Sequence, residues 1–402
     1  MRTYEKTHPW LTFKLDLRLV PWHLWLRLGE CQSKCQHISN VPLKVATADR
    51  LYQLFLAKGS LGSAAIEGNT LTEEEVVRHL EGRLTLPPSR EYLAREVDNI
   101  VSLCQEVTDQ IAGGQTLVLS RKRIQEINRR ILEGIPVEPG VIPGEIRKMT
   151  VGVARYRAAP AEDCEHLLDR LCAWIEAPEL SSKDEDVRLA CAIIKAVVAH
   201  LYFEWIHPFG DGNGRTGRMI EFSLLVASGV PAPAAHLMSN HYNLTRDEYY
   251  RQLDAASRSE GDVIPFIDYA VRGLLDGLRE QLRIIWQQQW DIAWRDYVDE
   301  HPVFRDKDSK VARRQQALVL DLSATGEATS MKAIPELTPR LARLYAPVSE
   351  RTLSRDLAVL EREKLLEHTD AGYRARKEII LAFRPPAAAA RERAAGDAPE
   401  TS

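Results

Sequence analysis

Long apolar runs, a signal peptide, a strong net charge and an ordered set of cysteines are all missing from this sequence. No apolar run comes near membrane-spanning length, and the first residues mix charged with apolar side chains, which is not the pattern of a signal peptide. The net charge of −4 gives the chain no general attraction to nucleic acid or to an anionic membrane. These absences predict a protein that does not engage a membrane.

The six cysteines are scattered along the chain rather than arranged as a disulfide or zinc framework. Only Cys31 and Cys35 are close together, and no second ligand pair accompanies them, so we expect reduced thiols. With 45% hydrophobic and 27% charged residues among 402, the composition is that of an ordinary soluble protein with room for two or three domains. A cytoplasmic location fits this composition.

One stretch, residues 207–218, has a composition that core packing does not explain. It reads His-Pro-Phe-Gly-Asp-Gly-Asn-Gly-Arg-Thr-Gly-Arg, which combines an imidazole, a carboxylate, a carboxamide, two guanidinium groups and four glycines. Apolar residues recur at helical spacing before it, and Pro208 disfavours helical dihedral angles at His207, which predicts a helix end there. A second apolar pattern predicts a helix that begins near residues 213–215.

The loop therefore leads into a helix N-terminus, where free N–H groups and the helix dipole favour anions. Gly212 and Gly214 lack the Cβ atoms that would keep a phosphate away from the main chain. Arg215 and Arg218 lie on one side of the first helical turn and can hold the same phosphates. The G-x-G-x-x-G pattern that ends at Gly217 needs a preceding strand, and a Walker A loop needs Gly-Lys-Ser/Thr, so both alternatives are rejected.

Two other side chains of the loop supply chemistry. Asp211 suits Mg²⁺, which binds through one carboxylate and substrate phosphates. An imidazole titrates near neutral pH, so His207 can accept a proton from an attacking hydroxyl. His200, Glu204 and His207 share a helical face and could be zinc ligands, but a complete site should show clearer ligand spacing.

Residues 207–218 resemble the HxFx(D/E)GNGRxxR signature of Fic proteins at every fixed position, and the likeness extends over roughly residues 41–271. Fic proteins are all-α domains with a short β-hairpin flap, and most transfer AMP from ATP to a protein hydroxyl. The resemblance implies that His207 is the base and that Asp211 holds Mg²⁺. It further implies a nucleotide cradle made of the anion hole (Gly212, Gly214), the α- and β-phosphate ligands (Asn213, Arg215), the γ-phosphate ligand (Arg218) and the rest of the turn (Thr216, Gly217).

A second motif, residues 63–69, reads Ser-Ala-Ala-Ile-Glu-Gly-Asn. It predicts a short helix closed by Gly68, with Glu67 at the C-terminal end, where the helix dipole disfavours an anion that lacks a cation or water. The segment resembles the (S/T)xxxE(G/N) inhibitory motif of Fic proteins, with Ser63, Glu67 and Gly68 at the fixed positions. The resemblance implies that Glu67 pairs with Arg218 and misplaces the γ-phosphate of ATP.

Residues 143–153 alternate in a way that suits a short strand or hairpin. They resemble the Fic flap, which holds the main chain of a target protein by strand addition. The resemblance implies that four flap residues approach the nucleotide: Val151, Gly152, Val153 and Ala154. In a predicted capped helix over residues 243–253, Tyr249 matches the adenine-side tyrosine of the family. The chain has Ser257 where family members can carry an asparagine near the nucleotide.

We expect five parts along the chain: an N-terminal helical segment with the inhibitory motif (1–110), a Fic catalytic core (111–285), a helical linker (286–306), a winged-helix domain (307–384) and a disordered tail (385–402). Helical patterns cover residues 45–58, 92–111, 120–132 and 164–175. An aromatic stripe near the linker indicates internal packing or a homodimer contact.

The predicted winged helix rests on helical patterns at residues 311–322, 330–344 and 349–366 and on a hairpin at residues 368–381. Arg351, Thr352 and Arg355 lie on the face that would enter a DNA groove. Acidic residues dilute the positive field that a DNA reader needs: Glu350, Asp356, Glu361 and Glu363. DNA binding and a protein-contact or dimerisation role therefore stay equally open.

The whole sequence favours an autoinhibited protein adenylyltransferase that uses Mg²⁺ and ATP, modifies a Ser, Thr or Tyr hydroxyl of an unknown target protein and of itself, and releases pyrophosphate. Two alternatives stay open: removal of AMP from a modified protein, with Glu67 positioning water, and an ATP-sensing DNA-binding regulator. A sensor would need neither His207 nor a flap, which favours an enzyme. Replacement of Glu67 separates the two enzymatic readings, because it raises transfer if Glu67 is a brake and stops AMP removal if Glu67 is a base.

Overall fold

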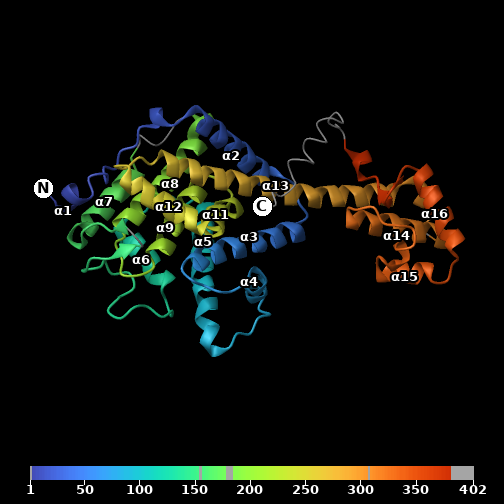
Figure 1. Ribbon diagram of the computed structural model, residues 1–402, viewed down its shortest axis with the longest axis horizontal. Coiled ribbons are helices and arrows are strands. Elements are labelled where there is room, and N and C mark those ends of the chain that lie inside the picture. Colours follow the sequence, from blue (N-terminus) through green and yellow to red (C-terminus); the bar gives the residue numbers. More distant parts are fainter. Residues whose placement is uncertain (1, 154–155, 178–183, 307, 382–402) are drawn as a thin grey trace. The chain divides into compact units, whose positions relative to one another are not determined.

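The computed structural model describes residues 2–153, 156–177, 184–306 and 308–381 (Figure 1). The described part is mostly helical with two small hairpins, in agreement with the predicted all-α class. The chain divides into two compact units, Met1–Arg283 and Ile284–Ser402. Ala154 and the tail at residues 385–402, both named by the sequence analysis, lie outside the described residues.

The elements of the first unit are α1 (Thr3–Thr7), α2 (Trp22–Asn40), α3 (Val45–Ile66), α4 (Glu73–Leu80), α5 (Glu91–Ala112), α6 (Arg121–Ile131), β1 (Gly152–Val153), β2 (Tyr156–Arg157), α7 (Cys164–Ile175), α8 (Glu185–Ile206), α9 (Asn213–Ala227), α10 (Ala232–Ala235), α11 (Leu237–Leu244), α12 (Arg246–Arg258) and the first part of α13 (Ile264–Glu300). Short 3₁₀ turns precede α2, α5 and α7. The predicted helices that became α5, α6 and α7 agree with these bounds to within a residue or two. Ser120 caps α6 by accepting a hydrogen bond from the Arg123 N–H, as predicted.

Helices α8 and α9 form the centre of the first unit (Figure 1). Helices α2 and α7 pack against α8, and α5 and α6 pack against α9. The segment Val187–Ile206 of α8 is long and apolar enough to cross a membrane, which corrects the expectation that no run approaches that length. However, 89% of this segment is buried inside the unit, so its apolar character reflects its place in the core.

Helix α3 differs from its prediction, because it runs unbroken through residues that the sequence divided into two pieces. Gly59 and Gly62, which lie between those two pieces, are placed where α11 packs on α3. A Cβ atom on Gly59 would lie 2.3 Å from the side chain of His236, and one on Gly62 would lie 3.0 Å from the main chain of Asn240. These glycines permit close helix packing, and that packing offsets their low helix propensity.

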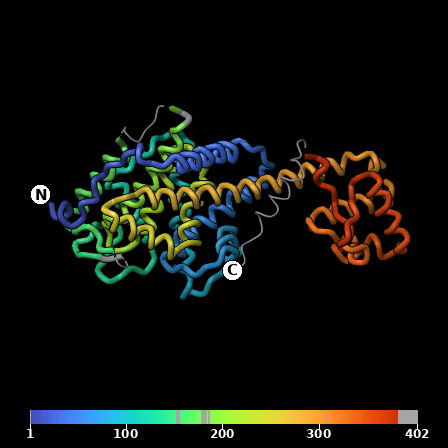
Figure 2. Tube along the Cα trace, turned by 45° about the horizontal axis from the view of Figure 1, so that its top comes forward, coloured from blue at the N-terminus to red at the C-terminus, as the bar shows by residue number. Residues whose placement is uncertain are grey.

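Two further elements of the first unit begin or end at other residues than expected. Residues 243 and 244 close α11, and α12 begins at Arg246 without a side-chain cap from Thr245, so the predicted capped helix at residue 243 is wrong. The strand or hairpin predicted over residues 143–153 is found only in part: residues 143–151 contain one isolated bridge, from Ile146 to Phe209, and the hairpin pairs β1 with β2, with Gly152 opposite Arg157. Figure 2 shows α2 beside the first part of α13, where Arg279 pairs with Glu30 at 2.8 Å.

The second unit has its own apolar core, to which the last part of α13 contributes Trp294 and Val298. Its elements are α14 (Lys310–Thr325), α15 (Pro339–Tyr345), α16 (Glu350–Arg362), β3 (Leu366–Thr369) and β4 (Gly372–Ala375). Strands β3 and β4 form the antiparallel hairpin that the sequence predicted. The predicted helix over residues 330–344 is wrong, since a short 3₁₀ turn (Ile334–Glu336) precedes α15, which begins at a proline after the capping residue Thr338.

Helix α16 presents Arg351 and Arg355 to solvent, and Thr352 is half-buried. Asp356 does not lie on that surface. It is buried and accepts hydrogen bonds from Arg314 Nε at 2.7 Å and from Gln315 Nε2 at 2.8 Å. Asp356 was counted among the residues that oppose DNA binding, and its burial beside Arg314 removes it from that count.

Candidate active site

His207 follows directly after α8, and hydrogen bonds to its own N–H and carbonyl fix its position. Its φ angle is +46°, in the left-handed region that non-glycine residues seldom adopt. The His207 N–H donates to the Phe203 carbonyl at 2.8 Å, and the Arg147 Nε donates to the His207 carbonyl at 2.7 Å. The His207 side chain is 16% exposed, so the ring lies at the edge of the core with one side open to solvent.

Arg147, at the base of the flap, was not identified from the sequence. Its buried guanidinium also donates to the carbonyls of Met149 at 2.6 Å, Ala159 at 2.5 Å and Ile206 at 3.3 Å. Burial lowers the pKa of Arg147 below its ordinary value, because these partners are neutral carbonyls rather than a carboxylate. Arg147 thereby joins the flap to the end of α8.

The turn after His207 is stabilised by its own side chains. Asn213 donates through Nδ2 to the Phe209 carbonyl and accepts through Oδ1 from the Phe209 N–H, both at 2.9 Å. Thr216 Oγ1 donates to the Gly212 carbonyl at 2.7 Å. Gly212 has a φ of +73°, a conformation that favours glycine. In this conformation the Asn213 carboxamide stabilises the loop by bonding the Phe209 main chain. The main-chain N–H of Asn213 can then bind an anion.

Asn128 of α6, also missed by the sequence analysis, connects this turn to the flap. Its Nδ2 donates to the Asp211 carbonyl at 3.0 Å and to Thr216 Oγ1 at 3.2 Å, while its Oδ1 accepts from the Gly144 N–H at 2.9 Å. A Cβ atom on Gly212 would lie 3.0 Å from the same amide nitrogen. The buried Asn128 carboxamide therefore holds the 207–218 loop and the segment before the flap hairpin in place.

Arg215 points between two carboxylates. Its Nη1 donates to Glu96 Oε1 at 2.5 Å and its Nη2 to Asp211 Oδ1 at 3.1 Å, whereas its buried Nε has no hydrogen-bond partner among the described residues. Glu96 also accepts from Asn69 Nδ2 at 2.8 Å. Glu96 of α5 thus connects the segment after Glu67 to the loop, a link that no local sequence pattern contains.

Arg218 is 2% exposed and lies against the end of α3. Its Nε donates to Ser63 Oγ at 3.0 Å, and its Nη2 donates to the Ser63 carbonyl at 2.9 Å and to Glu67 Oε1 at 2.7 Å. Burial alone would lower the pKa of Arg218, but the nearby Glu67, Tyr249 and Glu204 raise it above its ordinary value. The structure therefore contains the Glu67–Arg218 contact that the motif resemblance implied.

Glu67 follows the last residue of α3, and Gly68 adopts a φ of +106° just after it. A Cβ atom on Gly214 would lie 2.3 Å from Glu67 Oε1. The carboxylate therefore covers the first turn of α9, where N–H groups up to that of Arg215 lack the acceptors that a helix interior supplies. Glu67 occupies the position that the helix N-terminus offers to an anion.

The remaining predicted residues are distributed as follows. Val151 and the β1 main chain lie in the flap, whose base bridges to the loop through Ile146 and Phe209. Gly217 is buried in α9. Tyr249 is 1% exposed, and its hydroxyl lies 2.9 Å from His200 Nε2, so this conformation gives its ring no access to a bound base. A contact between Tyr249 and adenine stays a prediction.

The donor set for a metal ion consists of one carboxylate. Asp211 is 29% exposed; its Oδ1 accepts from Arg215 and Gly212, and none of the hydrogen bonds among the described residues uses its Oδ2. The described part of the chain contains no group of three or more His, Cys, Asp or Glu side chains able to hold a metal. His200, Glu204 and His207 therefore do not form a zinc site there. A single free carboxylate oxygen fits an ion that takes its other ligands from phosphates and water.

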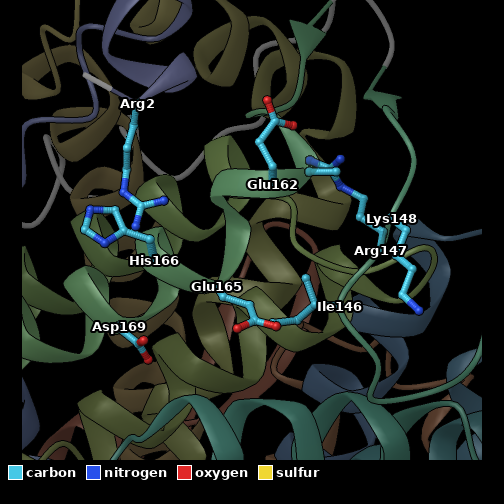
Figure 3. Close-up of a pocket in the computed structure, with 9 residues that line it drawn as sticks. Arg2, Ile146, Arg147, Lys148, Glu162, Glu165, His166 and Asp169 are labelled. Carbon is cyan, nitrogen blue, oxygen red and sulfur yellow. The ribbon is translucent and has the colours of Figure 1, made fainter.

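A cavity of about 550 Å³ lies beside the base of the flap (Figure 3). It is lined by Arg2, by Ile146, Arg147 and Lys148 of the flap base, and by Glu162, Glu165, His166 and Asp169 near the start of α7. No residue of the 207–218 loop lines this cavity. The cavity is therefore a surface feature separate from the loop.

Similarity to known proteins agrees with this geometry. Residues 118–225 match the Fic/DOC family. The chain is 29% identical over 211 residues to a protein adenylyltransferase of Caenorhabditis elegans, fic-1, and 28% identical over 235 residues to protein adenylyltransferase Fic of Nematostella vectensis. These matches cover 52% and 58% of this chain but 38% and 49% of the two relatives, so the chain spans less than half the length of either.

Solved structures agree on the fold. A Fic family protein from Desulfovibrio desulfuricans G20 superposes with a TM-score of 0.52 at 22% identity, covering 88% of this chain and 94% of that one. A Fic domain protein from Bacteroides thetaiotaomicron superposes with a TM-score of 0.50 at 20% identity, covering 64% and 96%. The arrangement of α8, the loop and α9 and the family match at residues 118–225 together lead to one conclusion: the chain contains a Fic domain.

Proposed function

We propose that this protein is an autoinhibited protein adenylyltransferase, which transfers AMP from Mg²⁺-ATP to a hydroxyl of a protein. The observation that carries the proposal is the pairing of Arg218 with Glu67 above Gly214, at a helix N-terminus next to His207. A site of this kind binds a polyphosphate and places a base beside it, while the carboxylate restrains it.

The proposed transfer begins when a target hydroxyl approaches the α-phosphorus of ATP. His207 accepts the hydroxyl proton, the oxygen–phosphorus bond forms, the bond between the α-phosphorus and its bridging oxygen breaks, and pyrophosphate leaves along α9. The N–H groups of Asn213 and Gly214 and the guanidinium of Arg215 would offset the charge on the phosphates. When bound, Mg²⁺ held by Asp211 would neutralise part of that charge.

The target would be positioned through its main chain. Strands β1 and β2 form a two-stranded hairpin, and a target segment that pairs with the hairpin would gain main-chain hydrogen bonds. Arg147 and Asn128 hold the base of the hairpin against the loop, so strand addition would set the distance between the target hydroxyl and His207. The same geometry allows modification of another copy of this chain.

Fewer observations support the other predicted partners and the predicted location. The exposed Arg351 and Arg355 of α16 support a DNA contact by the second unit, and Trp286, which is 47% exposed, supports a homodimer contact through α13. A cytoplasmic location fits six thiols that are all free, five of them buried. None of these properties is needed for the transfer.

The experiment that tests the proposed reaction compares two labels in the Glu67→Gly variant, in which the proposed brake is removed. We expect protein incubated with ATP labelled at the α-phosphate to become labelled, and protein incubated with ATP labelled at the γ-phosphate to stay unlabelled. Transfer of the γ-label would instead indicate a kinase, and binding of ATP with neither label transferred would indicate a sensor.

Removal of AMP from a modified protein is the second candidate, because Glu67 lies close enough to the loop to position a water molecule. Incubation of an AMP-modified protein with this enzyme and Mg²⁺ tests it. Release of AMP by the wild type but not by a Glu67→Gln variant would favour removal over transfer.

A further inference from the structure

Glu204 lies on the last turn of α8, three residues before His207, and its carboxylate faces the His207 ring. Glu204 Oε2 is 3.6 Å from His207 Nδ1. Both His207 Nδ1 and Glu204 Oε1 are buried, and neither has a hydrogen-bond partner among the described residues. Glu204 Oε2 is therefore the carboxylate oxygen that faces the unpartnered His207 Nδ1. Because buried polar groups ordinarily have partners, this nitrogen and this carboxylate form an incomplete pair.

The loop leaves room for this carboxylate. Gly217 lies in the second turn of α9, and a Cβ atom there would be 2.7 Å from Glu204 Oε1 and 3.1 Å from the Phe203 ring. The absence of a Cβ atom at Gly217 therefore leaves space for the Glu204 carboxylate beside α9. The Glu204 carboxylate therefore packs directly against the start of α9.

Several charged and titratable groups surround Glu204. His200 Nε2 lies 4.0 Å from Glu204 Oε1, and Arg218 and Tyr249 are close enough to interact with it electrostatically. Burial alone would raise the pKa of Glu204, but His207, His200 and Arg218 outweigh burial and lower it below its ordinary value. The carboxylate is thus ionised at neutral pH and can accept a hydrogen bond.

A comparison with Glu221 separates this arrangement from an ordinary buried carboxylate. Glu221 of α9 is also buried, but its Oε2 lies 3.0 Å from His200 Nδ1 and its Oε1 accepts from the Tyr242 hydroxyl at 2.9 Å. Glu221 is therefore fully partnered within the core, as a structural carboxylate should be. In Glu204, by contrast, Oε1 has no hydrogen-bond partner within the described part of the chain, and Oε2 faces the proposed base.

We infer that Glu204 is a positioning residue for the proposed transfer: its carboxylate accepts a hydrogen bond from His207 Nδ1–H and so keeps Nε2 unprotonated and turned toward the target hydroxyl. The inference rests on the proposed function. As the hydroxyl proton moves to Nε2, the imidazole becomes positively charged, and the negative Glu204 stabilises that charge. Glu204 itself takes up no proton.

The 3.6 Å separation is longer than a hydrogen bond, and a shift of less than 1 Å closes it. Catalytic hydrogen bonds are often long in the free enzyme and shorten when substrate is bound. Arg147 and Phe203 fix the His207 main chain, so the ring moves mainly about its side-chain torsions. Glu204 then selects one orientation of the ring.

Nuclear magnetic resonance of the full chain labelled with ¹⁵N-histidine tests this inference without any turnover. His207 signals are identified by their loss in His207→Ala. We expect the neutral His207 ring to carry its proton on Nδ1 in the wild type and to become a mixture of tautomers in Glu204→Gln. Glu221→Gln, which removes a buried carboxylate from the same helix pair, should leave the His207 signals as in the wild type. An unchanged His207 tautomer in Glu204→Gln overturns the inference.

Kinetics supply the second measurement, in a Glu67→Gly background that relieves the proposed brake. Glu204→Gln should lower kcat for AMP transfer by roughly 10- to 100-fold, leave KM for ATP within about twofold, and move the acidic limb of the rate–pH profile to lower pH. An unchanged kcat and profile overturn the inference. If no variant transfers AMP, the tautomer result still decides whether Glu204 orients His207, and only the proposed function fails. Should Glu204→Gln not fold, Glu204→Asp takes its place, with a smaller loss expected because it retains the charge.

Discussion

Arg218 Nη2 donates to Glu67 Oε1 over 2.7 Å, although the two residues are 151 positions apart in the chain. The same oxygen lies 2.3 Å from where a Cβ on Gly214 would be. One carboxylate therefore neutralises an arginine and covers the N-terminus of α9. A charge-assisted contact of this kind contributes about 1–3 kcal/mol, enough to restrain a site without destroying it.

Ser63 shares Arg218 with Glu67, so its removal should relieve the restraint in part. We expect Ser63→Ala to raise AMP transfer by roughly two- to fivefold, less than Glu67→Gly, because one neutral acceptor of the Arg218 Nε is lost. Initial rates with α-labelled ATP measure this. Ser60→Ala is the matched control, since Ser60 is buried on the same helix and its hydroxyl has no hydrogen-bond partner among the described residues. Equal rates for the two variants would contradict the role of Ser63.

Glu96→Gln should destabilise the protein by about 2 kcal/mol, because the buried Arg215 loses one of its two carboxylate partners and keeps only Asp211. Denaturant unfolding at pH 7.5 measures the change. Asp98→Asn, on the same helix but with a side chain that is 52% exposed and paired to His79, should cost less than about 1 kcal/mol. A similar loss in both variants would show that the Arg215 pair is not buried in solution.

Asn128→Ala should loosen the flap from the loop. The Gly144 N–H loses its acceptor in this variant, so we expect its hydrogen exchange to accelerate by at least about tenfold. Main-chain amides at the start of α7, which do not contact Asn128, should exchange as before. If the Gly144 amide keeps its protection, the link between the flap and the loop does not depend on Asn128.

His236 should make folding sensitive to mild acid. Burial lowers the pKa of His236 from 6.5 to about 3. The unfolded chain therefore takes up a proton below pH 6.5 while the folded one does not, so this stability is complete above pH 6.5 and declines as pH falls toward 3. Between pH 7.5 and 5.5 the free energy of unfolding should fall by about 1 kcal/mol less in His236→Gln than in the wild type. Identical pH dependence in the two proteins would mean that His236 is not buried as a neutral ring.

The sequence predicted those elements whose boundaries depend on neighbouring residues in the chain. Pro208 and the apolar spacing on either side of residues 207–218 predicted the end of α8 and the start of α9, since backbone sterics and helical periodicity act within a few residues. The Glu67–Arg218 contact was also anticipated, but from the motif resemblance and not from periodicity. The continuity of α3 through Gly59 and Gly62 could not be predicted in this way, because the residues that pack against these glycines, His236 and Asn240, are more than 170 positions away in the chain.

The supporting residues of the site could not be found in this way. Asn128 and Glu96 each meet the loop across more than 80 residues, and Arg147 across 60, so no local spacing relates them to it. Each is a single polar residue in an otherwise amphipathic pattern, where a solvated side chain is the more common outcome. Their roles follow only from the packing of α5, α6 and the flap around α9. Glu204 was noticed on the face of His207, but as a metal ligand rather than as a partner of the ring.

The most direct test of the account is the labelling of protein by α-labelled ATP, measured in parallel for the wild type, Glu67→Gly, and Glu67→Gly combined with His207→Ala. The account predicts at least several-fold more label in Glu67→Gly than in the wild type, and none in the double variant although it still binds ATP. Equal labelling of the wild type and Glu67→Gly would contradict the brake, and undiminished labelling without His207 would contradict the proposed base.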